Sequence, residues 1–256
     1  ITLDSETGWH TPILLDEDLP DPSRFRIDPR GKWWQFTLEF LKRAAQEARG
    51  QSIPSIGAFG GSGDILASLR GTERLLIDVI DRPDQVRAWE EHLMTIWCEA
   101  YDTFYALIHD AAEGSTCWIN LWSPGKFYAA QCDFSYMISP AMFRDIFLPI
   151  VDRQTRFLDH AVYHVDGIGA FAHVPALCEL PRLQALQILP GKGKPSPLHY
   201  IETLRTVQKA GKSLHITLPA NEVESALGLV NDYLNALPSD MEAVQMHAAL
   251  SALLGR

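Results

Sequence analysis

Apolar residues in the first third of the chain recur every three to four positions, the spacing typical of amphipathic helices. This spacing predicts a helix over 32–49 that ends at Gly50, because glycine is common just after a helix C-terminus. Its apolar stripe consists of Trp33, Phe36, Phe40, Leu41, Ala44 and Ala48. Further helices are predicted over 64–69 and 73–80, and a long helix begins at Pro83.

The rest of the chain alternates short apolar runs with helical patterns. Strands are predicted over 53–59, 117–122, 161–164, 183–189 and 213–218. Helices are predicted over 139–158, 174–180 and 198–210. The first of these starts with a Ser139 cap and is kinked at Pro149. This rhythm predicts parallel strands, because each crossover between parallel strands needs a connection such as a helix.

The C-terminal stretch allows two interpretations. Residues 223–237 carry a helical stripe, yet 228–233 could form a last short strand. The Ser239–Glu242 pair is a capping box that starts a final helix toward Leu254. The count is therefore five strands and one further candidate, fewer than the eight of a (β/α)8 barrel.

Composition and charge restrict the class of protein. The chain has 256 residues, 46% of them hydrophobic and 21% charged, and fits one domain over 1–256. Its net charge of −10 disfavours nucleic acid as a partner, and no apolar run is long enough for a membrane span. We therefore expect a cytoplasmic enzyme acting on a small molecule. The cysteines, Cys98, Cys117, Cys132 and Cys178, form no C-x-x-C pair.

Four segments together resemble the uroporphyrinogen decarboxylase superfamily, which also contains corrinoid-dependent methyltransferases. The main one is 131–149, where a polar stretch precedes Ser-Pro, a Phe and a helix with Leu-Pro near its end. The others, in matching order, are 53–59, 163–167 and 210–215. The resemblance covers about 53–218 and implies a (β/α)8 TIM-type barrel with its site at the carboxyl ends of the strands. It also implies that N-terminal strand–helix units are missing from this chain, which begins at Ile1.

His164 and Asp166 are the leading catalytic candidates. They are separated by one residue at the end of a predicted strand, so both side chains should leave the same face and point into one cavity. They could form a proton-transfer pair, in which the carboxylate raises the pKa of the imidazole, or bind a metal. In the corrinoid methyltransferases that the chain resembles, the matching motif is His-x-Cys-Gly, whose His and Cys bind zinc. Here Asp166 replaces that Cys, and carboxylate oxygen is a harder ligand than thiolate.

Other residues are expected to contact substrate. Gln131, Cys132 and Asp133 form a polar trio before a capped helix, although Asp133 could simply bond its own turn. The remaining candidates are Tyr163, Gln187 and His215. The Gly60–Gly63 segment fits no nucleotide-binding motif and is expected to form a tight turn that allows close approach of substrate. Trp118 and Trp122 could wall a pocket or fill the core.

These features lead to one functional hypothesis and two alternatives. The hypothesis is methyl transfer that involves a small thiol or a corrinoid carried by a partner protein, with zinc at His164 and Asp166. The first alternative is a cofactor-free decarboxylase acting on a tetrapyrrole or another carboxylated substrate. It is disfavoured because the family's N-terminal arginine motif has no counterpart here and the net charge is −10. The second alternative is a barrel that binds a ligand without turnover.

Overall fold

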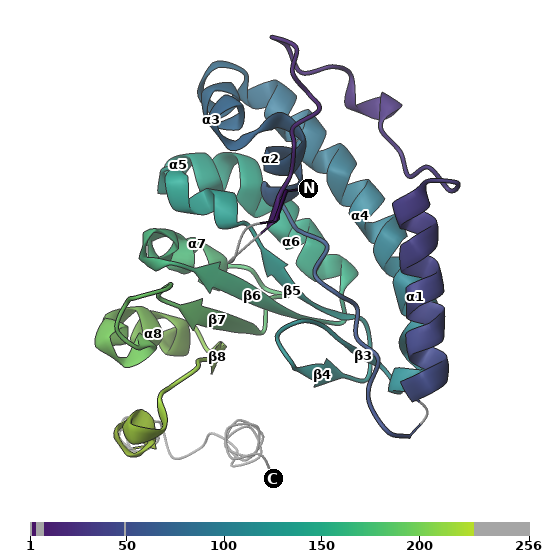
Figure 1. The fold of residues 1–256 in the computed structure, drawn as a ribbon. Helices are drawn as coiled ribbons and strands as arrows, with labels where there is room; N and C mark the ends of the chain where they lie inside the picture. The colour runs from purple at the N-terminus through teal and green to yellow at the C-terminus, as the bar shows by residue number, and fades with distance from the viewer. Residues whose placement is uncertain (1, 4–7, 49, 228–256) are drawn as a thin grey trace.

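The computed structural model describes residues 2–3, 8–48 and 50–227 and shows a mixed α/β fold (Figure 1). The strands are β1 (Thr2–Leu3), β2 (Gly8–Trp9), β3 (Ser115–Thr116), β4 (Trp122–Ser123), β5 (Phe127–Gln131), β6 (His160–Asp166), β7 (Ala185–Leu189) and β8 (Ser213–His215). The α-helices are α1 (Lys32–Ala48), α2 (Asp64–Arg70), α3 (Thr72–Asp81), α4 (Pro83–Ala112), α5 (Pro140–Met142), α6 (Leu148–Phe157), α7 (Val174–Cys178) and α8 (Ile201–Lys209). Short 3₁₀ segments are η1 (Pro22–Arg24), η2 (Asp133–Met137), η4 (Ile168–His173), η5 (Pro197–Tyr200) and η6 (Ala220–Glu222), and η3 (Phe143–Phe147) is a π-helix.

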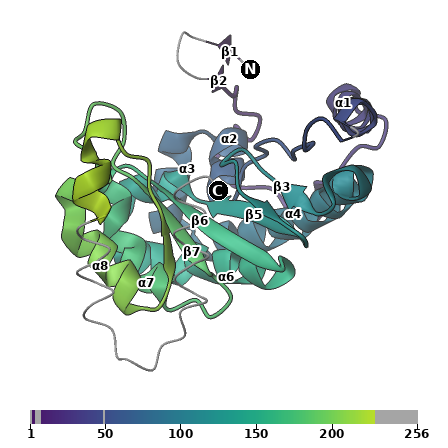
Figure 2. The same cartoon turned by 90° about the horizontal axis from the view of Figure 1, so that it is seen from below.

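A parallel sheet in the order β5-β6-β7-β8 forms the centre of the fold. Each pair of consecutive strands is joined by helical segments, and α6 and α7 lie on the same side of the sheet (Figure 2). Crossovers between parallel strands are nearly always right-handed, which places successive helices on one face. The predicted parallel pairing is confirmed for these strands, and β6 lies one strand away from β8.

Two predicted strands differ from the structure. Residues 53–59 make a single parallel bridge, between Ile56 and Cys117, and residues 117–121 form a turn region between β3 and β4. The turn contains Asn120 with φ of 58°, a left-handed conformation that asparagine tolerates better than most residues. Over the described ranges the sheet is therefore open, and a closed (β/α)8 barrel is not confirmed.

Helix α1 packs along α4, but with a different face from the one its stripe suggests (Figure 1). Amphipathic helices usually bury their apolar stripe. Here Trp33, Phe36 and Phe40 are exposed, whereas Leu41 and Ala48 are buried and Trp34 and Leu38 pack against the core. The periodicity thus located the helix correctly, but only Leu41 and Ala48 of the predicted stripe are buried, and Trp34 and Leu38 face the core in place of Trp33, Phe36 and Phe40.

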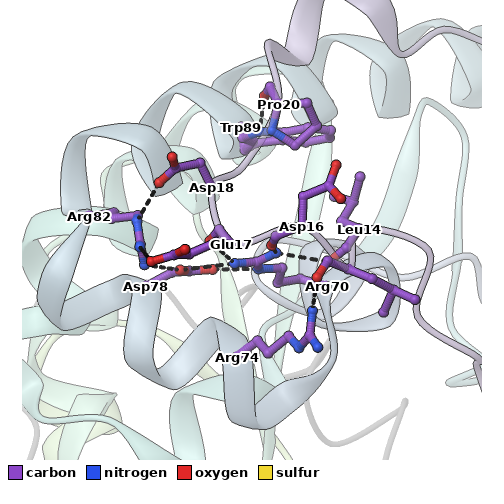
Figure 3. Close-up of polar contacts among 11 residues, drawn as sticks. Leu14, Asp16, Glu17, Asp18, Pro20, Arg70, Arg74, Asp78, Arg82 and Trp89 are labelled. Carbon is purple, nitrogen blue, oxygen red and sulfur yellow. Dashed lines mark hydrogen bonds and ion pairs between the residues drawn. The ribbon is translucent and has the colours of Figure 1, made fainter.

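The segment from Leu14 to Pro20 is fastened to the helices by side-chain donors (Figure 3). Arg70 at the end of α2 is 3% exposed and donates to the backbone oxygens of Leu14, Asp16 and Glu17. It also forms a two-point ion pair with the buried Asp78 of α3. These contacts fix a loop that has no regular structure of its own.

The predicted helix over 139–158 is present but irregular. Ser139 caps it, with Oγ accepting from the backbone N–H of Met142 at 3.2 Å. The ladder then widens to a π-helix over Phe143–Phe147, which ends two residues before Pro149. Proline lacks an N–H and clashes with the carbonyl four residues earlier, so the wider ladder lies where this clash would fall, and the kink at Pro149 stays a prediction.

Near the C-terminus, residues 223–227 are helical, in line with the stripe predicted from 223. The choice between helix and strand over 228–233 and the final helix over 239–254 lie outside the described residues. None of the helices in the described part of the chain has both the length and the apolar character that a membrane span requires.

Candidate functional site

Polar side chains form a row across the sheet near the carboxyl ends of its strands. The register pairs Gln131 of β5 with His164 of β6, His164 with Gln187 of β7, and Gln187 with His215 of β8. Residues paired in a parallel ladder lie side by side on the same face of the sheet. The sheet therefore brings together four of the residues that the sequence singled out.

Two carboxylates lie next to this row. Asp166 follows His164 by two positions on β6, and Asp133 begins η2 just after β5. One ligand atom each from Asp133, His164 and Asp166 lies within 4.8 Å of the others. The expectation that His164 and Asp166 share a face agrees with this geometry. Their environments differ, because His164 is buried whereas both aspartates are exposed.

The His164 ring is held on two sides. Its Nδ1 lies 2.5 Å from Oε1 of Gln187, and its centroid lies 4.6 Å from the Trp118 ring in an edge-to-face arrangement. Burial lowers the pKa of His164, and this outweighs the upward effects of Gln187, Asp166 and Asp64. Asp166 raises the imidazole pKa as expected, but the net shift is downward because the ring lies deeper than the carboxylates do.

A third carboxylate, Asp64 at the start of α2, adjoins the cluster. Its oxygens accept from Nε2 of Gln131 at 2.9 Å and from the backbone N–H of Phe134 at 3.0 Å. Desolvation, followed by the charge of Asp133, raises the pKa of Asp64 to about 6. Desolvation and the charge of Asp166 likewise raise the pKa of Asp133 to about 6. Carboxylates that crowd together favour cations or protons.

The glycine-rich turn lies against the polypeptide rather than against open space. A Cβ added to Gly61 would lie 2.4 Å from the backbone oxygen of Gln131. At Gly63, where φ is +78°, it would lie 2.6 Å from Sγ of Cys132. The turn was expected to allow close approach of substrate. In the structure, its lack of side chains instead allows close approach of the end of β5. It thereby positions Asp64 and Gln131 next to each other.

Cys132 and Tyr163 are not part of the cluster of ligand atoms. Cys132 is 2% exposed with Sγ against Gly63, and burial raises the pKa of its thiol well above the usual value. Tyr163 precedes His164 on β6, so its side chain points to the opposite face of the sheet, where it is buried. A role for either in contacting substrate stays a prediction.

Sequence reasoning missed Asp64 and the contact between Trp118 and His164. Asp64 directly follows the Gly60–Gly63 segment, and a carboxylate at such a turn was a readable signal. Trp118 was weighed as core or pocket wall, and it is half-buried beside the imidazole. Nothing in the sequence alone indicates that Trp118 packs against His164 on β6.

Comparisons with known proteins add little. No protein-family model matches the chain, and no curated protein matches it. Among solved structures it is similar to a methyltransferase from Methanosarcina mazei, with a TM-score of 0.48 and 13% sequence identity. That alignment covers 89% of this chain and 72% of the other. A likeness of this size does not identify an activity for this chain.

Proposed function

We propose that this protein binds a divalent metal ion through Asp133, His164 and Asp166 and is an enzyme that transfers a methyl group to a small thiol. The observation that carries the proposal is the convergence of three ligand atoms within 4.8 Å of one another, at the carboxyl ends of adjacent parallel strands. Ligands in open parallel sheets bind at this edge. Two carboxylates and one imidazole suit zinc or another first-row divalent ion.

The electrostatics favour a cation over a polyanion. Among the described residues, the charged groups that shift the pKa values of Asp64, Asp133 and His164 are all carboxylates. Such a field attracts a metal ion and opposes a substrate that carries several carboxylates. The same field is unfavourable for the alternative of a decarboxylase acting on a tetrapyrrole.

The chain's own groups have separable roles in this proposal. Asp133 and Asp166 supply negative charge at the exposed rim, and His164 supplies a nitrogen lone pair from below. Gln131 donates to Asp64, and its amide lies 3.5 Å from Oδ2 of Asp133, which orients the rim. Trp118 covers one side of the imidazole and excludes water there.

When bound, the metal would stabilise the thiolate form of the substrate, which is the nucleophilic form. The methyl donor that we propose is a corrinoid on a partner protein, in line with the family resemblance of 53–218. Cys132 is unsuited to act as the thiol, because it is enclosed and its raised pKa keeps it protonated. The acceptor thiol therefore belongs to the substrate.

The first experiment measures zinc binding to the full chain by competition with a chromophoric chelator. We expect one ion per chain, and we expect His164→Ala and Asp166→Asn to weaken its binding at least roughly tenfold, since each removes a ligand. Asp81→Asn, which alters an exposed carboxylate at the end of α3, is the matched control. Unchanged affinity in both site variants would overturn the metal site.

A second experiment tests the reaction. The zinc-loaded protein is incubated with methylcobalamin and a small thiol, and loss of the methylcobalamin absorbance is followed. Turnover that depends on His164 and Asp166 supports methyl transfer. Tight zinc binding without turnover over a panel of thiols would instead favour the alternative of a barrel that binds a ligand without catalysis.

A further inference from the structure

The contact between His164 and Gln187 determines more than the position of a ring. The two side chains are register partners on β6 and β7, and they are 7% and 6% exposed. His164 Nδ1 and Gln187 Oε1 are 2.5 Å apart. An amide oxygen can only accept a hydrogen bond, so with Oε1 of Gln187 facing the ring the hydrogen lies on Nδ1.

A neutral imidazole carries one N–H, and its other nitrogen has a free lone pair. With the hydrogen on Nδ1, the lone pair is on Nε2, and only a nitrogen with a lone pair can bind a metal. The Trp118 ring, at 87° to the imidazole, occupies another side and restricts its rotation.

We infer that Gln187 is a positioning residue that fixes His164 in the tautomer with hydrogen on Nδ1 and thereby reserves Nε2 for a ligand. The inference rests on the proposed function for its purpose, but the tautomer itself exists without any metal. Gln187 acts through His164, and its amide also separates His164 from His215, its register partner on β8. The amide nitrogen of Gln187, Nε2, can only donate hydrogen bonds, whereas its oxygen, Oε1, can only accept them.

The neighbouring histidine supports this arrangement. Gln187 is the register partner of His164 on one side and of His215 on the other, so the two imidazoles flank its amide in the row. Two charged imidazoles would repel across this row, whereas two neutral ones do not. A neutral amide between them holds His164 without adding a charge.

The test reads the tautomer directly by long-range ¹H–¹⁵N NMR of the metal-free protein above pH 8, where histidines are neutral. The His164 signals are assigned by their loss in His164→Ala. We expect a protonated Nδ1 in the wild type. In Gln187→Met, which keeps the volume but removes the acceptor, we expect a shift toward the Nε2–H form that dominates in free histidine.

Gln154→Met is the matched control. Gln154 is a fully buried glutamine on α6 whose side-chain atoms have no hydrogen-bond partner within the described structure, so its replacement should leave His164 unchanged. Gln187→Glu retains an acceptor oxygen and should restore the Nδ1–H form. Zinc affinity should fall roughly 10- to 100-fold in Gln187→Met and recover in Gln187→Glu.

The two ideas fail separately. A wild-type His164 protonated on Nε2, or a tautomer unchanged in Gln187→Met, would overturn the positioning role, because the amide would then donate to the ring or act only as packing. If the tautomer responds as expected while zinc fails to bind the wild type, the positioning role stands and the proposed metal site fails. Backbone amide spectra of each variant verify that the fold is retained.

Discussion

Replacing Arg70 with Met should destabilise the protein far more than any exposed ion pair could. The five N–H donors of the guanidinium are all used, two on Asp78 and three on the backbone oxygens of Leu14, Asp16 and Glu17 (Figure 3). Asp78 is 1% exposed, and in the variant its one remaining ion-pair partner among the described residues would be Arg82, whose Nη1 lies 3.1 Å from Oδ1. Removing one partner of a buried ion pair costs about 3–5 kcal/mol, mainly because the other charge stays buried.

Urea unfolding followed by tryptophan fluorescence measures this cost. Trp89 is a suitable reporter because its Nε1 donates to the oxygen of Pro20 in the same fastened segment. With a slope of about 3 kcal/mol per molar urea, the midpoint should fall by roughly 1 M or more. Arg144→Met is the matched control, since Arg144 and Glu179 are both about half exposed and such pairs contribute less than about 1 kcal/mol.

The double variant Arg70→Met, Asp78→Leu separates the causes. If the stranded carboxylate causes most of the loss, the double variant should recover a large part of it. Equal midpoints for Arg70→Met and Arg144→Met would refute the reasoning, because they would show that the buried network adds no more than a surface pair.

Two further predictions concern buried polar groups that are not proposed metal ligands. Glu90 is 1% exposed, and burial raises its pKa from 4.5 to about 7, so the folded state holds a proton that the unfolded state releases above pH 4.5. The free energy of unfolding should therefore fall as pH rises from about 4.5 to 7. The free energy of unfolding of Glu90→Gln should exceed that of the wild type by as much as about 3 kcal/mol at pH 8 and match it near pH 4. Urea unfolding at both pH values measures the difference. Tyr128 and Tyr163 are both buried, but the hydroxyl of Tyr128 accepts from the backbone N–H of Phe59, whereas that of Tyr163 interacts with the Ser135 side chain outside hydrogen-bond geometry. Tyr128→Phe should thus cost about 1 kcal/mol and Tyr163→Phe clearly less, with zinc affinity unchanged in the latter; equal losses would contradict this assignment.

The helices were largely predictable because their signals are local. The bounds of α1 and α3 and the start of α4 follow from spacing, glycine and proline, and the Ser139 cap is present as predicted. What spacing could not decide is which side of α1 faces inward. That choice depends on how Leu41 and Ala48 fit against α4, and this is a property of two packed surfaces and not of one sequence window.

The short strands were less predictable for the same physical reason. A run such as 117–122 is apolar enough for a strand, yet a hairpin with Asn120 in a left-handed conformation uses the same residues as a turn. Residues 53–59 pair only at Ile56, since strand pairing requires a neighbour in register and the sequence does not specify one. In contrast, β6 and β7 gained neighbours on both sides and extend over most of their predicted ranges.

At the candidate site, the arrangement of residues within one strand was predictable from the sequence. Contacts between residues of different segments were not. Alternation along β6 predicts that His164 and Asp166 share a face. The partners of His164, which are Gln187 and Trp118, come from other segments and depend on register. The downward net shift of the His164 pKa was missed for the same reason, because the sequence indicates a nearby carboxylate but not the depth of the ring.

This difference in depth unifies the chemistry of the site. His164 is buried and its pKa is lowered, so it offers a neutral nitrogen, whereas Asp133 is more exposed and its pKa is raised by desolvation and by the charge of Asp166. Mutual repulsion among Asp64, Asp133 and Asp166 works against folding, and a bound cation opposes that repulsion. Binding to the folded state alone also stabilises it in proportion to the logarithm of ligand concentration. An arrangement that is unfavourable for the fold by itself and favourable with a cation is characteristic of a functional site rather than of packing.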